Sequence, residues 1–469
     1  MYDLVIVGGG IAGLCAALAA PRGARIVVID KGEARSGSSP LAQGGLAAAV
    51  GPDDTPDLHA RDTISAGAGI CDDDIVKDVC EEGPDAIAWL VAQGCDFDRN
   101  EDGSLHLARE GGQTVARSVH WRDATGQEIV RALRAAVRDR DVERVQESAA
   151  SVLVEDGRCV GVAAGARAFA GRATLLATGG AGALWAATTN AAGATGDGIV
   201  LALQAGAQVA DLEFMQFHPT ALAHGGAQRV LLTEALRGHG ATLIDAAGER
   251  FVDELGPRHV VAKAILDRGD AFLDCRHLTD LEEQFPTVVA GARAHGFDAR
   301  SEPLPVTPAA HYFIGGVAAD AHGRTSVRGL FAAGECAATG MHGANRMAGN
   351  SLLETVVIGR RVGAAAAGEP EPGSSGVATG EVLPNPDRRL PPLMWDGAGP
   401  IRDGVSLLAL IDGLRELEDG PHRDLCLMVA RAALARAESR GVHIRSDEPA
   451  TEPAYAARSF DRAPRRMAH

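Results

Sequence analysis

The first thirty residues follow a pattern that few folds accommodate: an apolar run, a glycine-rich turn, a small-residue helix and a second apolar run. The run 2–7 leads into Gly8, Gly10 and Gly13 at the spacing G-x-G-x-x-G, and the run 25–29 ends at Asp30. In a β-α-β unit, glycines at this spacing let the backbone approach a pyrophosphate at the helix N-terminus, and the acid holds a ribose hydroxyl. Because strand, helix, second strand and acid all fall in register, the sequence predicts a Rossmann-like dinucleotide-binding domain.

Two later segments repeat the pattern of an apolar strand that ends in a glycine turn. The run 174–176 leads into Ala177, Thr178 and Gly179, and the run 329–333 leads into Gly334 and Glu335. Asp156-Gly157 predicts a hairpin within the β-rich region 151–177. Residues 36–46 are small and polar, which fits a loop lying along a cofactor and equally fits a surface loop. We expect the two glycine turns to place backbone beside the same dinucleotide.

The stretch 339–351 sets one arginine among small residues and ends at a predicted helix start. Arg346 carries a planar guanidinium that can bind a carboxylate with two hydrogen bonds. The sequence Asn350-Ser351-Leu352 predicts the first turn of a helix, whose free N–H groups suit an anion or an electron-rich ring edge. Together with the N-terminal turn, this stretch indicates a dinucleotide-bound flavin that faces a small acidic substrate.

The 469 residues are enough for two or three domains. The βα pattern of 1–211 stops at 212–311, which we interpret as an inserted capping domain, and resumes over 312–364. Residues 365–392 have the composition of a linker. Leucines at helical spacing after residue 405 predict a helical domain over 393–469. The predicted fold class is therefore α/β: a Rossmann-like domain, an inserted α+β capping domain and a C-terminal helical domain.

Composition excludes several classes of protein. A net charge of −17 with 4% aromatic residues argues against a nucleic-acid-binding surface. The eight cysteines show no metal-binding spacing, so buried free thiols are expected. A first strand at about Tyr2 leaves no room for a signal peptide, and no apolar run approaches the ~18 residues of a membrane span. These features predict a cytoplasmic protein.

Seven short motifs, in this order, resemble those of one flavoprotein family. They are Ala42-Gln43-Gly44-Gly45, Arg109-Glu110-Gly111-Gly112, Gln216-Phe217-His218-Pro219-Thr220, Thr233-Glu234-Ala235-Leu236-Arg237-Gly238, Pro257-Arg258, His311-Tyr312 with Gly315-Gly316, and His342-Gly343-Ala344-Asn345-Arg346-Met347-Ala348. The chain is identified by them as similar to the L-aspartate oxidases, within the superfamily of succinate dehydrogenase and fumarate reductase flavoproteins. The likeness covers residues 1 to about 364 and resumes at 438–443.

The resemblance implies an activity, a cofactor and partners. The family oxidises L-aspartate to iminoaspartate with FAD, the first step of NAD biosynthesis by way of quinolinate, and O₂ or fumarate reoxidises the flavin. Ser38 stands where covalent superfamily members have a histidine, so non-covalent FAD is expected. Docking to quinolinate synthase is a further family-based expectation, whereas no nucleic-acid partner and no membrane span are expected.

The family's substrate-binding positions fall on residues of matching chemistry. Two carboxylates removed from water each need several donors, and two histidines, two arginines and two hydroxyls can supply them. These residues are His218, Thr233, Arg258, His311, Arg346 and Ser351. The resemblance also implies that Glu110 pairs with the substrate ammonium and that Arg258 donates a proton when fumarate is reduced.

The expected FAD contacts come from the glycine turns, the 36–46 loop and the helix start. They are Gly8, Gly10, Ile11, Ala12, Gly13, Asp30, Lys31, Ser38, Ser39, Gln43, Gly44, Gly45, Ala177, Thr178, Gly179, Asp197, Glu335, Asn350, Ser351 and Leu352. Two positions depart from the family pattern: Gly349, where serine is common, and Gln113-Thr114, where His-Ser is frequent. Either departure is expected to weaken a polar contact without removing the site.

Three alternatives stay open at this point. The nearest is a soluble fumarate reductase or succinate dehydrogenase flavoprotein, against which Ser38 and Glu110 argue. A flavoprotein of tRNA modification shares the glycine turn but should carry a basic surface. A cofactor-binding module without activity would not need the clustered arginines and histidines.

Overall fold

The computed structural model describes residues 1–32, 37–372 and 382–462, and within these ranges its largest sheet has seven strands. The sheet runs β6-β2-β1-β9-β8-β7, and β16 also pairs with β9. Its parallel strands are β1 (Tyr2–Val7), β2 (Ile26–Ile29), β6 (Val142–Val145), β9 (Arg167–Leu176) and β16 (Leu330–Ala332). Antiparallel β7 (Ala149–Glu155) and β8 (Arg158–Ala164) form the hairpin predicted at Asp156-Gly157, which is confirmed.

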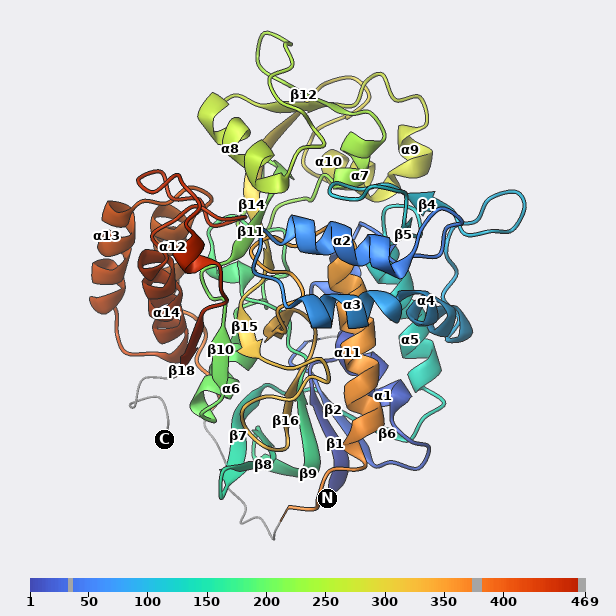
Figure 1. Ribbon diagram of the computed structural model, residues 1–469, viewed down its shortest axis with the longest axis vertical. Helices are drawn as coiled ribbons and strands as arrows, with labels where there is room; N and C mark the ends of the chain where they lie inside the picture. The colour runs from blue at the N-terminus through green and yellow to red at the C-terminus, as the bar shows by residue number, and fades with distance from the viewer. Residues whose placement is uncertain (33–36, 373–381, 463–469) are drawn as a thin grey trace.

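Helices cover one face of this sheet (Figure 1). They include α1 (Ile11–Ala19), α5 (Thr125–Val137) and α11 (Asn350–Ala366). Gly359 and Gly363 of α11 pack so close to the α1 backbone that an added Cβ would lie 2.7 Å or less from a carbonyl oxygen of Ala12 or Ala16. The predicted helix start at Asn350 is confirmed, and it brings α11 against the first β-α turn.

A second sheet, β11-β14-β13-β12, lies almost entirely in the region predicted as an insertion. Its strands are β11 (Met215–Leu222), β12 (Thr242–Ile244), β13 (Phe272–Asp274) and β14 (Leu304–Phe313). The helices of this region are α7 (Glu234–Gly238), α8 (Arg258–Arg268), α9 (Leu281–Gln284) and α10 (Pro286–Ala294). In Figure 1 these elements lie at the top, and β11 and β14 lead down toward the parallel sheet.

The remaining elements connect these two parts. Two small sheets are β3 (Leu46–Ala47), β5 (Ser118–Val119) and β4 (Leu107–Ala108), and β17 (Ala337–Ala338), β15 (Gly316–Ala318), β10 (Gln208–Ala210) and β18 (Phe460–Arg462). The other helices are α2 (Pro56–Ala66), α3 (Asp73–Glu81), α4 (Gly83–Ala92), α6 (Asp197–Gln204), α12 (Leu390–Ala398), α13 (Gly404–Arg415) and α14 (Pro421–Ala435). The α/β fold class predicted from the sequence is confirmed.

The C-terminal region differs in two ways from the sequence expectation. Leu407, Leu410 and Leu425 belong to the same hydrophobic core as the parallel sheet, so α13 and α14 do not have a separate core. The last described residues of this region form strand β18, which pairs with β10. At the predicted linker, α12 begins within 365–392, because Pro391 and Pro392 stand in its first turn, where no N–H is needed. Residues 373–381 of that linker and 463–469 of the predicted helical domain lie outside the described residues, as does Ser36 of the predicted loop.

Each of the eight cysteines is a free thiol, and all are buried except Cys71, which is half-buried. The prediction of buried free thiols is therefore confirmed for seven of them. Across the described ranges, the helices are all too short or too polar to cross a membrane.

Candidate active site

A cavity of about 640 Å³ extends from the first β-α turn to the base of the β11-β14 sheet. Nearly every residue predicted from the sequence to bind FAD or substrate lines it. The two exceptions are Gly13 and Asn350. Gly13 packs against the turn instead, since an added Cβ would lie 2.1 Å from the Gly8 carbonyl oxygen. Asn350 is fully buried, and its side chain binds His59 and Thr63.

One end of the cavity is built from backbone and small side chains. Gly8 has a φ of +110°, and an added Cβ would lie 2.1 Å from the Ala177 carbonyl oxygen, so only glycine fits this turn. Gly179, in the second glycine turn, has open space where a side chain would stand. Asp30 accepts a hydrogen bond from the Gly9 N–H at 3.0 Å. The two turns thus leave a cradle that a side chain would fill, at the positive end of α1.

The loop predicted to lie along the cofactor does border this cavity. Ser39 Oγ accepts from the Ile11 N–H at 3.3 Å, and Ser38 Oγ accepts from the Ala191 N–H at 3.3 Å. Gln43 donates to the Leu231 carbonyl through its amide nitrogen, while its buried Oε1 has no hydrogen-bond partner among the described residues. A buried polar atom without a partner at the wall of such a cradle is what a bound dinucleotide would satisfy, so Gln43 and the small residues beside it fit FAD.

Lys31 and Asp197 face the same end and bind each other. Lys31 Nζ lies 2.6 Å from Asp197 Oδ2, and His422 of α14 lies 2.9 Å from Asp197 Oδ1. Burial opposes ionisation of Asp197, but the hydrogen bond from His422 and the charge of Lys31 hold its pKa well below the usual range. A helix of the C-terminal region therefore fixes the carboxylate that holds Lys31 at the cavity wall.

The other end of the cavity gathers the predicted substrate residues. Gln216 Oε1 accepts hydrogen bonds from Arg258 at 3.0 Å and from Arg346 at 3.2 Å. Arg346 also donates to Ser351 Oγ at 3.0 Å, and its buried Nη2 has no hydrogen-bond partner in the part of the chain that the structure describes. A buried guanidinium with a free donor is set to receive a carboxylate. Thr233 lines the cavity at the start of α7.

The two predicted histidines lie side by side, with ring centroids 5.0 Å apart. His311 Nδ1 contacts Thr189 Oγ1 at 2.8 Å, and His218 Nδ1 accepts from the Thr220 N–H at 3.3 Å. Burial lowers the pKa of both rings well below the usual value, and nearby positive groups lower it further. Both histidines are therefore neutral, and each can offer one N–H to an anion without adding charge.

Sequence reasoning did not single out Glu234, which lines the cavity, or Arg237, which contacts Glu234. Glu234 lies 2.5 Å from Arg258 Nε and 3.7 Å from Arg237. Although burial opposes ionisation, Arg258 and Arg237 lower the pKa of Glu234 to about 2. Both residues belong to the motif at 233–238. The sequence therefore did indicate their contact, because it places an acidic and a basic residue one helical turn apart.

Glu110 is buried in the cavity wall. Its Oε1 accepts a hydrogen bond from the Gly45 N–H at 3.1 Å. The residue after it, Gly111, donates its backbone N–H to Glu234 at 2.8 Å. Burial and the charge of Glu234 raise the pKa of Glu110. Glu110, which is predicted to pair with the substrate ammonium, thus lies in the same cavity wall as the residues predicted to bind its carboxylates.

The structure accounts for both departures from the family pattern. Gln113 is buried, accepts from the Glu110 N–H at 3.0 Å and donates to Ser118 and to the Ala348 carbonyl, so it holds the loop that carries Glu110. Gly349 has a φ of +82°, and an added Cβ would lie 2.8 Å from the backbone of Ala47. This backbone geometry requires glycine rather than serine.

The sequence profile of the FAD binding domain family matches residues 3–352. L-Aspartate oxidase of Caulobacter vibrioides is 46% identical over 96% of this chain and 94% of its own length, and that of Streptomyces coelicolor is 44% identical over 95% and 88%. This chain belongs to the L-aspartate oxidase family. FAD is the cofactor of this family member, and the cradle described above accommodates it.

Solved structures of related flavoproteins share this fold. A chain of E. coli quinol fumarate reductase is 31% identical, with a TM-score of 0.87 over 96% of this chain and 92% of its own. The Mycobacterium smegmatis Sdh1 complex contains a chain that is 28% identical, with a TM-score of 0.81 over 97% and 90%.

Proposed function

We propose that this protein oxidises L-aspartate to iminoaspartate with non-covalently bound FAD, the first step of NAD biosynthesis through quinolinate. The observation that carries the proposal is the position of Glu110 in the same cavity as Arg258, Arg346 and two neutral histidines. L-Aspartate has two carboxylates and one ammonium, and these groups match its charges. When bound, FAD accepts the two electrons and the hydrogen lost from the substrate Cα.

The protein residues hold the substrate and manage its protons. Arg346, with Ser351 and the histidines, binds carboxylate oxygens and so fixes the Cα–H in one orientation. Oxidation of an ammonium to an imine also releases a proton from nitrogen. Glu110, whose pKa is raised by burial, can pair with the ammonium and accept that proton.

When fumarate serves as the oxidant of the reduced flavin, a proton must reach one of the fumarate carbons. Arg258 lies in the cavity and contacts Glu234, which in turn contacts Arg237. We propose that this chain of three ionisable groups delivers the proton. O₂ or fumarate as electron acceptor, docking to quinolinate synthase and a cytoplasmic location stay predictions.

The test is a panel of amino and dicarboxylic acids supplied to the purified, flavin-loaded protein under air, with hydrogen peroxide as the readout. L-Aspartate should give peroxide. L-Asparagine, which lacks one carboxylate, and succinate, which lacks the amine, should not, and succinate should compete with aspartate. Rapid succinate oxidation without aspartate turnover would support the fumarate reductase or succinate dehydrogenase alternative.

A second experiment tests how the flavin is bound. Acid precipitation should leave the flavin in the supernatant; flavin in the pellet would contradict non-covalent binding.

A further inference from the structure

The loop that carries Arg346 is held from outside the cavity by the C-terminal segment. Arg458 donates to the carbonyls of Ala338 and Thr339 at 2.8 and 2.9 Å, where the loop begins. Nearer its end, the Val442 N–H donates to the Ala344 carbonyl at 2.9 Å. The backbone of residues 338–344 is therefore fixed at two points by residues that follow α14.

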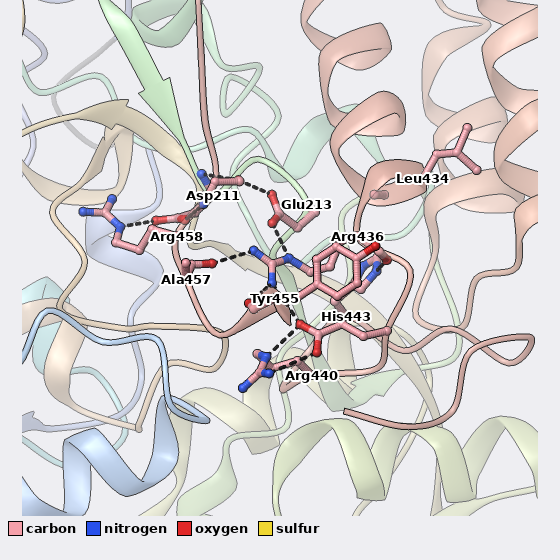
Figure 2. Close-up of polar contacts among 12 residues, drawn as sticks. Asp211, Glu213, Leu434, Arg436, Arg440, His443, Tyr455, Ala457 and Arg458 are labelled. Atoms are coloured by element: carbon pink, nitrogen blue, oxygen red, sulfur yellow. Dashed lines mark hydrogen bonds and ion pairs between the residues drawn. The ribbon is translucent and has the colours of Figure 1, made fainter. Parts of the chain in front are cut away.

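The same segment also holds the start of β11. Arg458 Nε lies 2.7 Å from Asp211 Oδ2, and Asp211 exchanges further hydrogen bonds with Ser459. Asp211 has a φ of +61°, which is rare for a residue with a side chain and is maintained here by these contacts. Ser459 Oγ donates to Glu213 at 2.7 Å. Figure 2 shows Arg458 and Arg436 reaching Asp211 and Glu213 from the C-terminal segment.

We call the charged side chains of this region the C-terminal ion network. Its members are Asp211, Glu213, Arg436, Glu438, Arg440 and Arg458. Arg436 lies 2.6 Å from Glu213 and 2.9 Å from Glu438, and both carboxylates are fully buried. Arg440 lies 2.7 Å from Glu438 and also donates to the Ala68 carbonyl. Buried ion pairs add little net stability, because desolvation offsets their attraction, but they penalise any arrangement in which a charge loses its partner.

The network meets the active site at Gln216, on the strand that begins just after Glu213. Gln216 Nε2 donates to the Arg346 carbonyl at 2.9 Å and to Asn345 Oδ1 at 3.0 Å. Its Oε1 accepts from both Arg346 and Arg258. Gln216 is thus the contact between β11 and the Arg346 loop, and the C-terminal ion network holds both of them.

We propose that the C-terminal ion network is a positioning device that fixes the Arg346 loop against β11 and so sets the spacing of the two guanidiniums that receive the substrate carboxylates. Arg458 is its central positioning residue, because it binds both Asp211 and two carbonyls of the loop. The inference rests on the proposed function insofar as the ligand is a dicarboxylate. The network residues do not take part in the reaction, which the cavity residues carry out.

The test compares Arg458→Met with Arg445→Met in the full-length, FAD-loaded protein. Arg445 is the matched control, since it too is a C-terminal arginine that binds one carboxylate and two backbone carbonyls. Its partners are Asp447, Ala433 and Leu434, none of which belongs to the loop. The probe is succinate, whose Kd is measured from the change it causes in the flavin absorbance. Aspartate KM, kcat and the thermal midpoint are measured in parallel.

In Arg458→Met we expect succinate Kd and aspartate KM to rise together by roughly ten- to a hundredfold, as for a carboxylate held slightly out of place. Arg445→Met should keep the wild-type Kd even where its thermal midpoint falls equally. A wild-type succinate Kd in Arg458→Met, or an equal rise in both variants, would overturn the proposal.

Gly441→Ala serves as a second variant should Arg458→Met fail to fold. An added Cβ at Gly441 would lie 2.2 Å from the Ala344 carbonyl oxygen and must displace it, so succinate Kd should again rise. A normal Kd in folded Gly441→Ala would overturn the proposal. Wild type that binds succinate but does not oxidise aspartate would refute the proposed function alone, because the succinate comparison still tests the network.

Discussion

Arg258 donates from Nε to the carboxylate of Glu234 across 2.5 Å, and both side chains are almost entirely removed from water. The contact leaves the rest of the Arg258 guanidinium toward the cavity, where Gln216 also binds it. A charged pair in this position can hold an arginine in place and can also exchange a proton with it. Replacing the Glu234 carboxylate with an amide distinguishes these two roles, positioning of Arg258 and proton exchange with it.

Glu234→Gln should separate these roles, because the amide keeps a hydrogen-bond acceptor for Arg258 but cannot relay a proton. We expect kcat for fumarate reduction to fall by about a hundredfold, which is typical of lost acid–base catalysis. Aspartate oxidation, which needs no proton at carbon, should fall much less. Steady-state rates with each substrate test this, and equal losses would show that Glu234 only positions Arg258.

Glu110→Gln should show the opposite preference. The variant removes the negative charge that faces the substrate ammonium, whereas fumarate has no amine to lose a partner. A charge-assisted contact is worth roughly 1.5–3 kcal/mol, so kcat/KM for aspartate should fall by about ten- to a hundredfold with fumarate reduction nearly unchanged. The control variant is Gln113→Ala, which removes a support of the loop that carries Glu110 but keeps the charge of Glu110. Equal losses for aspartate and fumarate in Glu110→Gln would mean that Glu110 only supports the loop.

The pH dependence follows from the same carboxylate. Burial and Glu234 raise the pKa of Glu110 above its usual value of 4.5, so this group loses its charge at a higher pH than an exposed glutamate. Below that pKa the carboxyl is neutral and cannot attract the ammonium; above it the attraction is complete. We expect kcat/KM for aspartate to fall as pH drops through this range, and the fall to be absent in Glu110→Gln. An acid limb of unchanged shape in the variant would assign it to another group.

The sequence predicted the parts of the site that depend on local pattern. The glycine turns, Asp30 and the α11 start each need only a short segment, so their spacing was sufficient. Pairs between distant segments leave no such pattern: Arg258 meets Glu234 from 24 positions away, and Arg436 meets Glu213 from 223. Asn350 shows the same limit, since its place in the motif suggested a cofactor contact and only the fold reveals that His59 binds it.

Arg346 Nη2 is buried, and no atom within residues 1–32, 37–372 and 382–462 accepts a hydrogen bond from it. Arg346→Leu should leave FAD bound, because the cradle at the other end of the cavity is intact, yet it removes a bidentate partner from a substrate carboxylate. We expect aspartate KM to rise by about ten- to a hundredfold or more, the value of one or two charge-assisted hydrogen bonds. Succinate Kd should rise in parallel, since it presents the same carboxylates. Flavin content and flavin absorbance serve as the control for an intact cofactor site, and unchanged kinetics would place Arg346 outside the substrate contacts. Arg346→Lys should recover only part of the loss, because an ammonium restores the charge without the planar fork.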